Sequence, residues 1–354
     1  DVPLASVRVI LGDTRLVPSD RGTTGSMSTR TIGIQLRRAA AAARQTLIGL
    51  AAERWAAPAA SLATRDGHVF QTGEPGRTVS YAGLLQGQAL RVAIPEDTVI
   101  KDPERFLLMG RDAPRSDALA LVTGQAKFSQ DTAVAGMLQG KVLRPPSYGA
   151  RLQQINVRQA ERVAGVVMVV REDDFVGVIS EREDTAEFAL ERIRARWQED
   201  VELPSDWDLS ALLKENAGEL VVLREEGSLA AGFNQADHVL EGRYFVPYVS
   251  NSAMEPSAAV ASWDGDDLTV WSGDRSPFGV RDELAQAFGI SADRVHVITI
   301  DIGGSFGTKA SNGVAYEAAR LSRAAGRPVR VAHNRSEEFM WSTVRPAAVI
   351  EIRS

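Results

Sequence analysis

Residues 301–309 read DIGGSFGTK and follow the apolar run VHVITI at 295–300. A strand, a glycine-rich turn and a helix in this order bind phosphate groups in many proteins, because glycines let the backbone approach a ligand closely. The spacing differs from two familiar motifs. A P-loop has Lys before its Ser or Thr, whereas Thr308 precedes Lys309 here, and the glycines do not form Gly-x-Gly-x-x-Gly. The turn is therefore predicted to bind a less common ligand.

A second stretch, RGTTGSMSTR at 21–30, also combines glycines with hydroxyl side chains directly before a predicted helix. The hydroxyls can donate hydrogen bonds, and the helix dipole favours an anion. Two interpretations of each loop stay open. The first loop is either an ordinary N-cap or a ligand site. The turn at 301–309 is either a ligand site or a tight connection with Phe306 in the core. Two such loops together suggest one large anionic ligand gripped from both sides.

Acidic residues elsewhere are interpreted as structural. Glu255, in AMEP at 253–256, is expected to be paired or to cap a helix rather than to act as a catalytic base. In NRSEEF, Ser336 is expected to cap a helix whose first turn holds Glu337 and Glu338, where acids complement the helix dipole. No catalytic residue is predicted within this chain.

The composition narrows the classes of site. The chain has 354 residues, no Cys and a formal net charge of -6. Without Cys it can form no disulfide, thiolate nucleophile, iron–sulfur ligation or Cys-type zinc site. Its four histidines lack metal-ligand spacing, and His296 and His333 are expected to be hydrogen-bonded structural residues. No metal ligand is therefore predicted, and any metal must arrive in a cofactor that brings its own ligands.

Charge and hydropathy bear on partners and compartment. The acidic balance, with no basic block, argues against nucleic acid as a partner. The longest apolar stretches, such as VAGVVMVV at 163–170, are too short to span a bilayer, so the protein is expected to be soluble. The compartment, cytoplasmic or periplasmic, stays open.

Periodicity predicts the elements that position the two loops, and the fold class is mixed α/β (α+β). The predicted strands are 5–11, 136–146, 166–170, 175–180, 258–263, 268–272, 295–300 and 328–333, with a hairpin at 62–70. The predicted helices run from the first loop to Trp55, over 184–197, over 277–288 with Pro277 in the first turn, and from Val314 to Ala325. The predicted organisation is a first unit at 1–85, a linker at 86–117, a compact module at 118–200, a polar connection with one short helix at 201–235, and a last unit at 236–354.

Taken in order, these stretches resemble the molybdopterin-binding large subunit of the molybdenum hydroxylases, the xanthine dehydrogenase and aldehyde oxidase family. The branch of isoquinoline 1-oxidoreductase and nicotinate dehydrogenase is the most similar. The resemblance lies in RVILGDTRLVPSDRGTTGSMST at 8–29, in the long segments 122–152 and 253–285, and in DIGGSFGTK with the residues after it. It implies an α/β hammerhead domain at 118–200, flanked by portions of molybdopterin-binding domains at 1–85 and 236–354.

The resemblance implies molybdopterin as cofactor, in the cytosine dinucleotide form. The pterin dithiolene holds molybdenum in this family, which agrees with a chain that lacks thiols. Backbone amides around Ser305, Phe306 and Gly307 would face the ligands of the metal, and the Thr-Gly-Ser loop would contact pterin or nucleotide phosphates. The implied cofactor-binding residues are Gly22, Thr24, Gly25, Ser26, Ser28, Thr29, Gly303, Gly304, Ser305, Phe306 and Gly307.

Five positions depart from the family pattern. Ser305 and Thr308 stand where the glycine turn commonly has Gly, and their side chains are expected to crowd the metal or reshape the pocket. Asp274-Arg275 replaces a Thr-Gln pair whose Gln lies near the metal, so Arg275 becomes a candidate substrate residue. Asn251 replaces a common His before Met-Glu-Pro.

The activity implied by the resemblance belongs to an assembly. It is hydroxylation of an aromatic N-heterocycle or an aldehyde with oxygen from water, with electrons passed to a [2Fe-2S] subunit and cytochrome c as a further candidate partner. The family's catalytic Glu lies in a Gly-x-Gly-Glu segment that this sequence lacks. The chain is therefore expected to be an interior piece or half of a split large subunit, inactive without the remaining segments or a second large-subunit chain. The alternative is a non-catalytic cofactor-binding or scaffold fragment.

Overall fold

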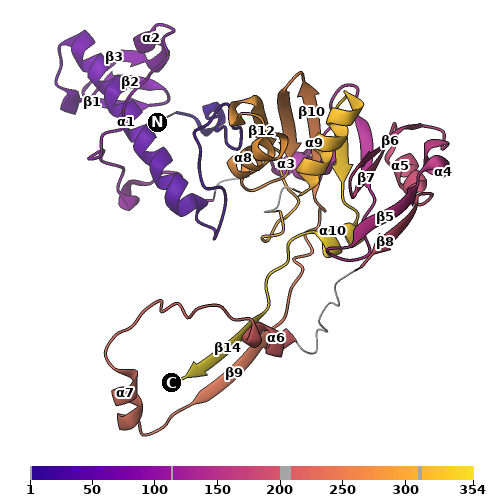
Figure 1. The fold of residues 1–354 in the computed structure, drawn as a ribbon. Helices are drawn as coiled ribbons and strands as arrows, with labels where there is room; N and C mark the ends of the chain where they lie inside the picture. The colour runs from indigo at the N-terminus through magenta and orange to yellow at the C-terminus, as the bar shows by residue number, and fades with distance from the viewer. Residues whose placement is uncertain (1, 113–114, 200–208, 310–312) are drawn as a thin grey trace. The chain divides into compact units, whose positions relative to one another are not determined.

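The computed structural model describes residues 2–112, 115–199, 209–309 and 313–354 (Figure 1). These residues form two compact units. The N-terminal unit comprises Asp1–Leu11 and Gly22–Ala126, and the main unit comprises Gly12–Arg21 and Lys127–Ser354. Helices and mixed sheets occur together, so the predicted fold class is confirmed. No helix of the described residues has the length and apolarity needed to cross a membrane.

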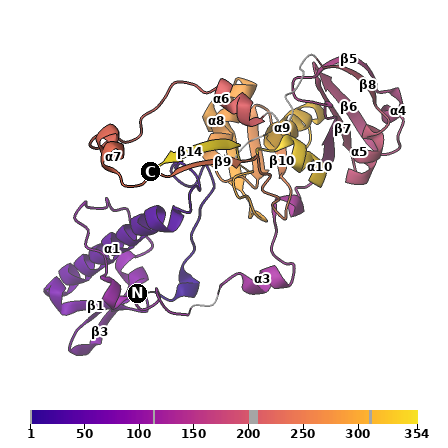
Figure 2. The same cartoon turned by 90° about the horizontal axis from the view of Figure 1, so that it is seen from below.

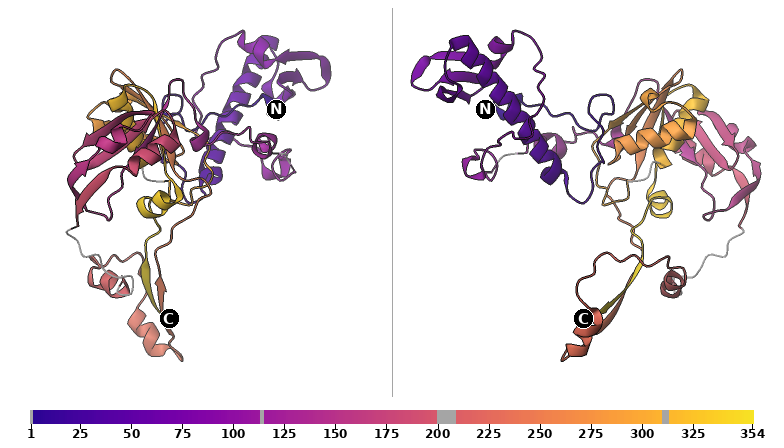
Figure 3. Two further views of the ribbon diagram at one scale, coloured as in Figure 1. Left: turned by 90° about the vertical axis from the view of Figure 1, so that its right-hand side faces the viewer. Right: turned by 60° about the vertical axis from the view of Figure 1, so that its left-hand side comes forward.

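The N-terminal unit packs one long helix against a small antiparallel sheet (Figure 3). Leu47 and Ala51 of the helix bury against Leu62 and Val69 of the sheet. The predicted helix to Trp55 and the hairpin at 62–70 are confirmed, and the hairpin turns at Asp66–Gly67. The elements of this unit are α1 (Ser28–Trp55), β1 (Leu62–Arg65), β2 (His68–Gln71), β3 (Glu74–Ser80), α2 (Tyr81–Leu85) and α3 (Ala118–Val122).

The strand predicted at 5–11 is wrong. Leu4–Ser6 form a 3-10 turn, and residues 7–11 are irregular, with Val7, Val9 and Leu11 exposed. A strand needs a partner for its backbone groups, and the antiparallel bridge falls slightly later in the chain, between Asp13 and Ile298.

The main unit is built on a seven-stranded mixed sheet in the order β12-β11-β10-β13-β4-β7-β6. Its strands are β4 (Leu138–Val142), β6 (Val166–Glu172), β7 (Phe175–Ser180), β10 (Ala258–Asp264), β11 (Asp267–Ser272), β12 (Val295–Thr299) and β13 (Val329–Ala332). Two separate pairs are β5 (Arg151–Asn156) with β8 (Arg194–Gln198), and β9 (Glu241–Val246) with β14 (Ala348–Arg353). The helices are α4 (Arg158–Glu161), α5 (Glu183–Leu190), α6 (Leu209–Glu215), α7 (Leu229–Gln235), α8 (Pro277–Phe288), α9 (Gly313–Ala325) and α10 (Arg335–Trp341).

Two sequence predictions for this unit need correction. The helix predicted over 184–197 ends at Leu190, and Arg194–Gln198 form β8, in which Trp197 pairs with Leu152. Pairing with β5 outweighs the helical periodicity there. The connection at 201–235, of which 201–208 lie outside the described residues, holds two short helices rather than one. The remaining predicted strands and helices are present, with shifted ends.

Opposite faces of β4 and β7 carry different helices (Figure 2). Val176 and Val178 of β7 pack with α5, whereas Ile179 belongs to the core cluster that includes α9. On the α9 face, the fully buried Leu321 lies against two glycines. A Cβ at Gly140 or at Gly177 would come within 2.6 Å of a Leu321 methyl carbon. The absence of two side chains on the sheet therefore makes room for one leucine of the helix.

The parallel pair β11–β12 sets the place of the candidate site. Ser272 is opposite Thr299, and Ile300 N–H donates to Ser272 O, so both strands end at the same sheet edge. Pro277 occupies the first turn of α8, as predicted. Loops at the carboxyl ends of neighbouring parallel strands commonly bind ligands.

We expect Gly177→Ala to lower the free energy of unfolding by about 1–3 kcal/mol, because the added methyl overlaps Leu321. Gly313→Ala, at the start of α9 with no atom within 4 Å of the new Cβ, is the matched control and should leave stability unchanged or slightly raised. Urea denaturation measures both. Equal stability of the two variants would contradict the packing described.

Candidate functional site

Two loops meet at the carboxyl edge of β11 and β12. The first, residues 273–276, follows β11, and the glycine turn, defined as residues 301–309, follows β12. A Cβ on Gly273 would lie 2.5 Å from Ile302 Cγ2 and 2.8 Å from Ser129 Oγ. Only glycine at position 273 allows these two loops to pack this closely.

The glycine turn has an unusual backbone. Gly304 and Gly307 both have φ of 102°, and Phe306 has φ of 52°. The Phe306 side chain is 76% exposed, so the interpretation of this residue as core is wrong. Positive φ at a bulky residue is unfavourable and occurs mostly where the surroundings enforce it, often at ligand sites.

The turn displays hydrogen-bond donors. Among the described residues, none accepts a hydrogen bond from the backbone N–H groups of Gly304, Ser305, Phe306 and Gly307. The hydroxyl oxygens of Ser305 and Thr308 are buried and likewise have no partner among those residues. Successive N–H groups in a turn form a cradle for an anion or another acceptor. This part of the sequence prediction, a ligand-binding turn, fits the geometry.

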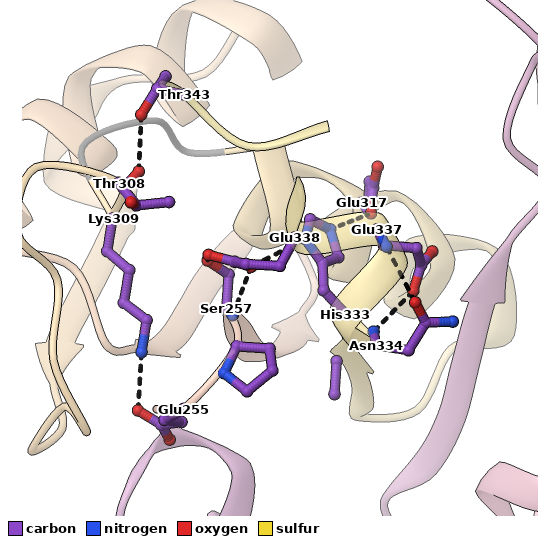
Figure 4. A network of polar contacts seen from close by, with 12 residues as sticks. Glu255, Ser257, Thr308, Lys309, Glu317, His333, Asn334, Glu337, Glu338 and Thr343 are labelled. Atoms are coloured by element: carbon purple, nitrogen blue, oxygen red, sulfur yellow. Dashed lines mark hydrogen bonds and ion pairs between the residues drawn. The ribbon is translucent and has the colours of Figure 1, made fainter. Parts of the chain in front are cut away.

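Lys309 does not serve the turn as a free cation. Its ammonium group is 2.8 Å from Glu255 Oε2, and their side chains are 3% and 10% exposed (Figure 4). Burial raises the pKa of Glu255, but donors including Gly303 N–H and the Lys309 ammonium outweigh burial, so the pKa lies below its ordinary value. Glu255 is therefore a paired carboxylate, as predicted.

Arg275 and Asp274 lie on the neighbouring loop. Asp274 is buried, and it accepts a hydrogen bond of 2.7 Å from Ser276 N–H. Burial raises the pKa of Asp274 to about 6, and the Ser276 N–H and the Arg275 charge offset only part of this effect. Arg275 is partly buried at the same sheet edge as the glycine turn. Asn251 also faces the turn, since its Nδ2 lies 3.5 Å from a Cβ placed on Gly307.

The other predicted loop, residues 22–29, belongs to the N-terminal unit. Helix α1 begins at Ser28, and its N-cap is Met27, which makes no side-chain capping bond. The interpretation of this loop as an ordinary Ser or Thr cap is therefore wrong. Gly25 and Ser26 have φ of 56° and 55°. Thr24, Gly25, Ser26 and Thr29 are exposed, and Gly22 and Ser28 are partly buried.

Residues 12–14, a short way before this loop, pair with strand β12, a contact that was not predicted from the sequence. Thr14 N–H donates to Val297 O at 3.1 Å, and Thr299 N–H donates to Gly12 O at 2.7 Å. Asp13 Oδ1 lies 2.8 Å from His296 Nε2, which makes His296 a hydrogen-bonded structural residue, as predicted. Gly12–Thr14, here called the edge clamp, thus covers the edge strand β12 directly ahead of the glycine turn.

A cluster of largely buried charged residues, formed by Arg144, Glu317, His333 and Glu338, packs against residue Ser257 near the site. Glu338 accepts hydrogen bonds from the N–H and hydroxyl groups of Ser257, and His333 lies between Glu338 and Glu317 (Figure 4). Burial lowers the pKa of His333, but the two carboxylates raise it more, to about 9. Arg144 pairs with Glu317. These contacts confirm His333 as structural and fix α10 against residues 255–257.

The start of α10 differs from the prediction. Asn334, not Ser336, is the N-cap, and it forms a capping box in which Glu337 N–H donates to Asn334 Oδ1 at 2.9 Å. Glu337 also binds Arg144, and Glu338 is buried, so neither acid acts only as a partner of the helix dipole. Among the described residues, no group of His, Asp or Glu has an arrangement suited to a metal ion.

Comparisons with known proteins bear on this arrangement. Sequence profiles of the molybdopterin cofactor-binding domain match residues 1–110 and 213–354. A nicotinate dehydrogenase subunit of Pseudomonas putida is 32% identical over 99% of this chain and 30% of its own length. The beta subunit of isoquinoline 1-oxidoreductase from Brevundimonas diminuta is 26% identical over 90% of this chain and 46% of its own length.

A solved structure is also similar. Quinoline 2-oxidoreductase from Pseudomonas putida 86 superposes with a TM-score of 0.58 and 25% identity, over 69% of this chain and 37% of that chain. The chain thus spans less than half the length of each of these three relatives.

We expect Asp274→Asn to stabilise the protein at neutral pH and to have little effect in acid. The pKa of Asp274 is about 6 in the folded state against 3.8 ordinarily, so wild-type stability falls as pH rises between these values. A shift of this size corresponds to about 3 kcal/mol above pH 6. Asn keeps the acceptor for Ser276 N–H. Urea denaturation of both proteins at pH 4 and pH 7.5 measures the difference, and a difference independent of pH would contradict the assignment.

Proposed function

The chain belongs to the molybdopterin-binding subunits of the molybdenum hydroxylase family, and on that premise we propose that it supplies cofactor-binding segments to such an oxidoreductase. The proposed reaction is hydroxylation of an aromatic N-heterocycle or an aldehyde, with oxygen from water. Relatives named for nicotinate, isoquinoline and quinoline support the heterocycle class.

One observation carries the proposal. The glycine turn holds four consecutive backbone N–H groups that donate to no described residue, and two buried hydroxyl groups without a partner among those residues. A rigid, oxygen-rich cofactor would accept from such donors, whereas a folded connection without a ligand would leave them to water or unpaired. The chemical character of the turn therefore fits molybdopterin.

Specific residues are proposed to hold the cofactor, in its cytosine dinucleotide form. Gly304, Ser305, Phe306 and Gly307 would approach the metal end through backbone N–H groups, and Gly303, whose N–H is bound by Glu255, would lie against the cofactor. Gly22, Thr24, Gly25, Ser26, Ser28 and Thr29 would contact phosphate groups, and the uncapped N-terminus of α1 supports this role. When bound, the cofactor supplies two-electron redox chemistry at molybdenum.

Arg275 is proposed to contact substrate. It lies on the loop beside the glycine turn, and its positive charge suits a substrate that carries a carboxylate or another acceptor. The neighbouring Asp274 is buried and has a pKa of about 6, so above that pH its negative charge offsets part of the positive charge of Arg275.

Domains and partners complete the proposal. We propose residues 118–200 as a hammerhead domain, with 1–85 and 236–354 as portions of molybdopterin-binding domains joined by a linker at 86–117 and a connection at 201–235. The partners would be remaining large-subunit segments or a second large-subunit chain, and a [2Fe-2S] subunit, with cytochrome c as a further candidate. The names of several relatives identify them as subunits, which supports an assembly.

The test is elemental and pterin analysis of the protein purified gently from a host that makes the cofactor. We expect close to one molybdenum and one pterin per chain. Gly307→Ala should lower both severalfold, because φ of 102° is unfavourable for alanine. Gly49→Ala, in the middle of α1 with no atom within 4 Å of its new Cβ, serves as the control. Absence of pterin from the wild-type protein would favour a scaffold role.

A further inference from the structure

The side chain of Glu255 accepts hydrogen bonds from two separate parts of the chain, residues 129–130 and the glycine turn. Its Oε1 accepts from Ser129 Oγ at 2.7 Å and from Gln130 N–H at 3.0 Å. Its Oε2 accepts from Gly303 N–H and from Lys309 Nζ, both at 2.8 Å. One carboxylate oxygen thus bonds to a residue near each end of the glycine turn.

The backbone reinforces this contact. Glu255 N–H donates to Gly303 O at 3.2 Å, so Glu255 and Gly303 bind each other through both main-chain and side-chain groups. A Cβ on Gly303 would lie 2.5 Å from Glu255 Cβ. The approach is so close that only glycine fits at position 303 while a side chain stands at 255.

A role for Glu255 as a general base does not fit these contacts. A base needs a free lone pair within reach of the proton that it takes up. The carboxylate is 10% exposed, both of its oxygens already accept two hydrogen bonds, and its pKa lies below the ordinary value. These features suit a fixed charge that holds other groups in place.

We propose that Glu255 is a positioning residue, which clasps the glycine turn closed with Lys309 and ties it to Ser129 and Gln130. The clasp keeps the N–H groups of Gly304–Gly307 converged on the ligand. The ligand-binding part of this inference rests on the proposed function, whereas the closure of the turn does not.

The nature of the contacts explains why closure needs both partners. Lys309→Met would leave a buried carboxylate without its cation, which is strongly unfavourable. Glu255→Gln keeps the shape but turns one oxygen into a donor NH₂ group. In one orientation of the glutamine amide, the NH₂ group takes the place of Oε2 and faces the donors of Gly303 and Lys309. In the other orientation it takes the place of Oε1 and faces the donors of Ser129 and Gln130. Each change should therefore loosen the same turn.

Hydrogen–deuterium exchange measures closure directly, through the amide protons of Gly303 and Thr308. Gly303 N–H donates to Glu255, and Thr308 N–H donates to Ser305 O within the turn. We expect exchange in the segment 301–309 to rise by roughly tenfold or more in Glu255→Gln and in Lys309→Met, since a bond to a charged group is lost. The segment 301–309 should exchange no faster in the double variant than in the faster of the two single variants, because Glu255 and Lys309 act as one unit.

The matched control is Lys141→Met, which removes another buried ion pair of the main unit. Lys141 is 4% exposed and pairs with Glu183 and Glu187 at 2.8 and 2.9 Å. This variant should lose stability but keep slow exchange at 301–309. Faster exchange there in Lys141→Met, equal to that in Glu255→Gln, would show global loosening and overturn the proposal.

Pterin and molybdenum retained per chain give the second readout. We expect Glu255→Gln and Lys309→Met to retain severalfold less than Lys141→Met at equal thermal stability. Unchanged exchange in Glu255→Gln overturns the clasp, and faster exchange with undiminished retention overturns its positioning role. If the wild-type protein holds no pterin, the proposed function fails, and the exchange data alone decide whether the turn is clasped.

Discussion

Three residue pairs between β4 and β13 join the two halves of the main sheet. Residues 329–331 pair in parallel with 138–140, and in the described sheet this is the junction between β6, β7, β4 and β10–β13. Leu321 seals it by packing into the space left at Gly140 and Gly177, and the ammonium of Lys141 donates to Ala332 O on the other strand. The segment that leads into β4 also reaches the candidate site, because Ser129 Oγ and Gln130 N–H donate to Glu255.

Hydrogen bonds and ion pairs then fix the glycine turn on the main unit. Residues 255–257 are fixed on two sides, because Glu255 binds the turn and Ser257 binds Glu338 of α10. Thr343, just after α10, donates to Thr308 O at 2.8 Å. The turn is therefore held near its start by the buried carboxylate of Glu255 and near its end by the hydroxyl group of Thr343. Such bracing is what holds a backbone with three positive φ values in one shape.

Sequence reasoning predicted the elements whose signals are local. The β10–β11 hairpin, Pro277 in the first turn of α8 and the glycine turn after β12 follow from alternation, turn residues and periodicity. It failed where distant partners decide the structure. Trp197 lies in a strand because β5 pairs with it, and Ser129 supports the turn from 126 residues before Glu255. No local sequence pattern predicts either contact. The Gly-Asp-Thr sequence at 12–14, by contrast, is typical of a turn and could have been used to predict that these residues pair with another segment.

The edge clamp has a consequence for the order in which the chain folds. Asp13 and His296 are 283 residues apart in sequence. At typical rates of synthesis, β12 follows Gly12–Thr14 out of the ribosome after roughly 15 to 60 seconds. The N-terminal unit can close its own core of Leu47, Ala51, Leu62 and Val69 during that time. The clamp is thus completed late, because it can close the β12 edge only after the chain has been made as far as His296.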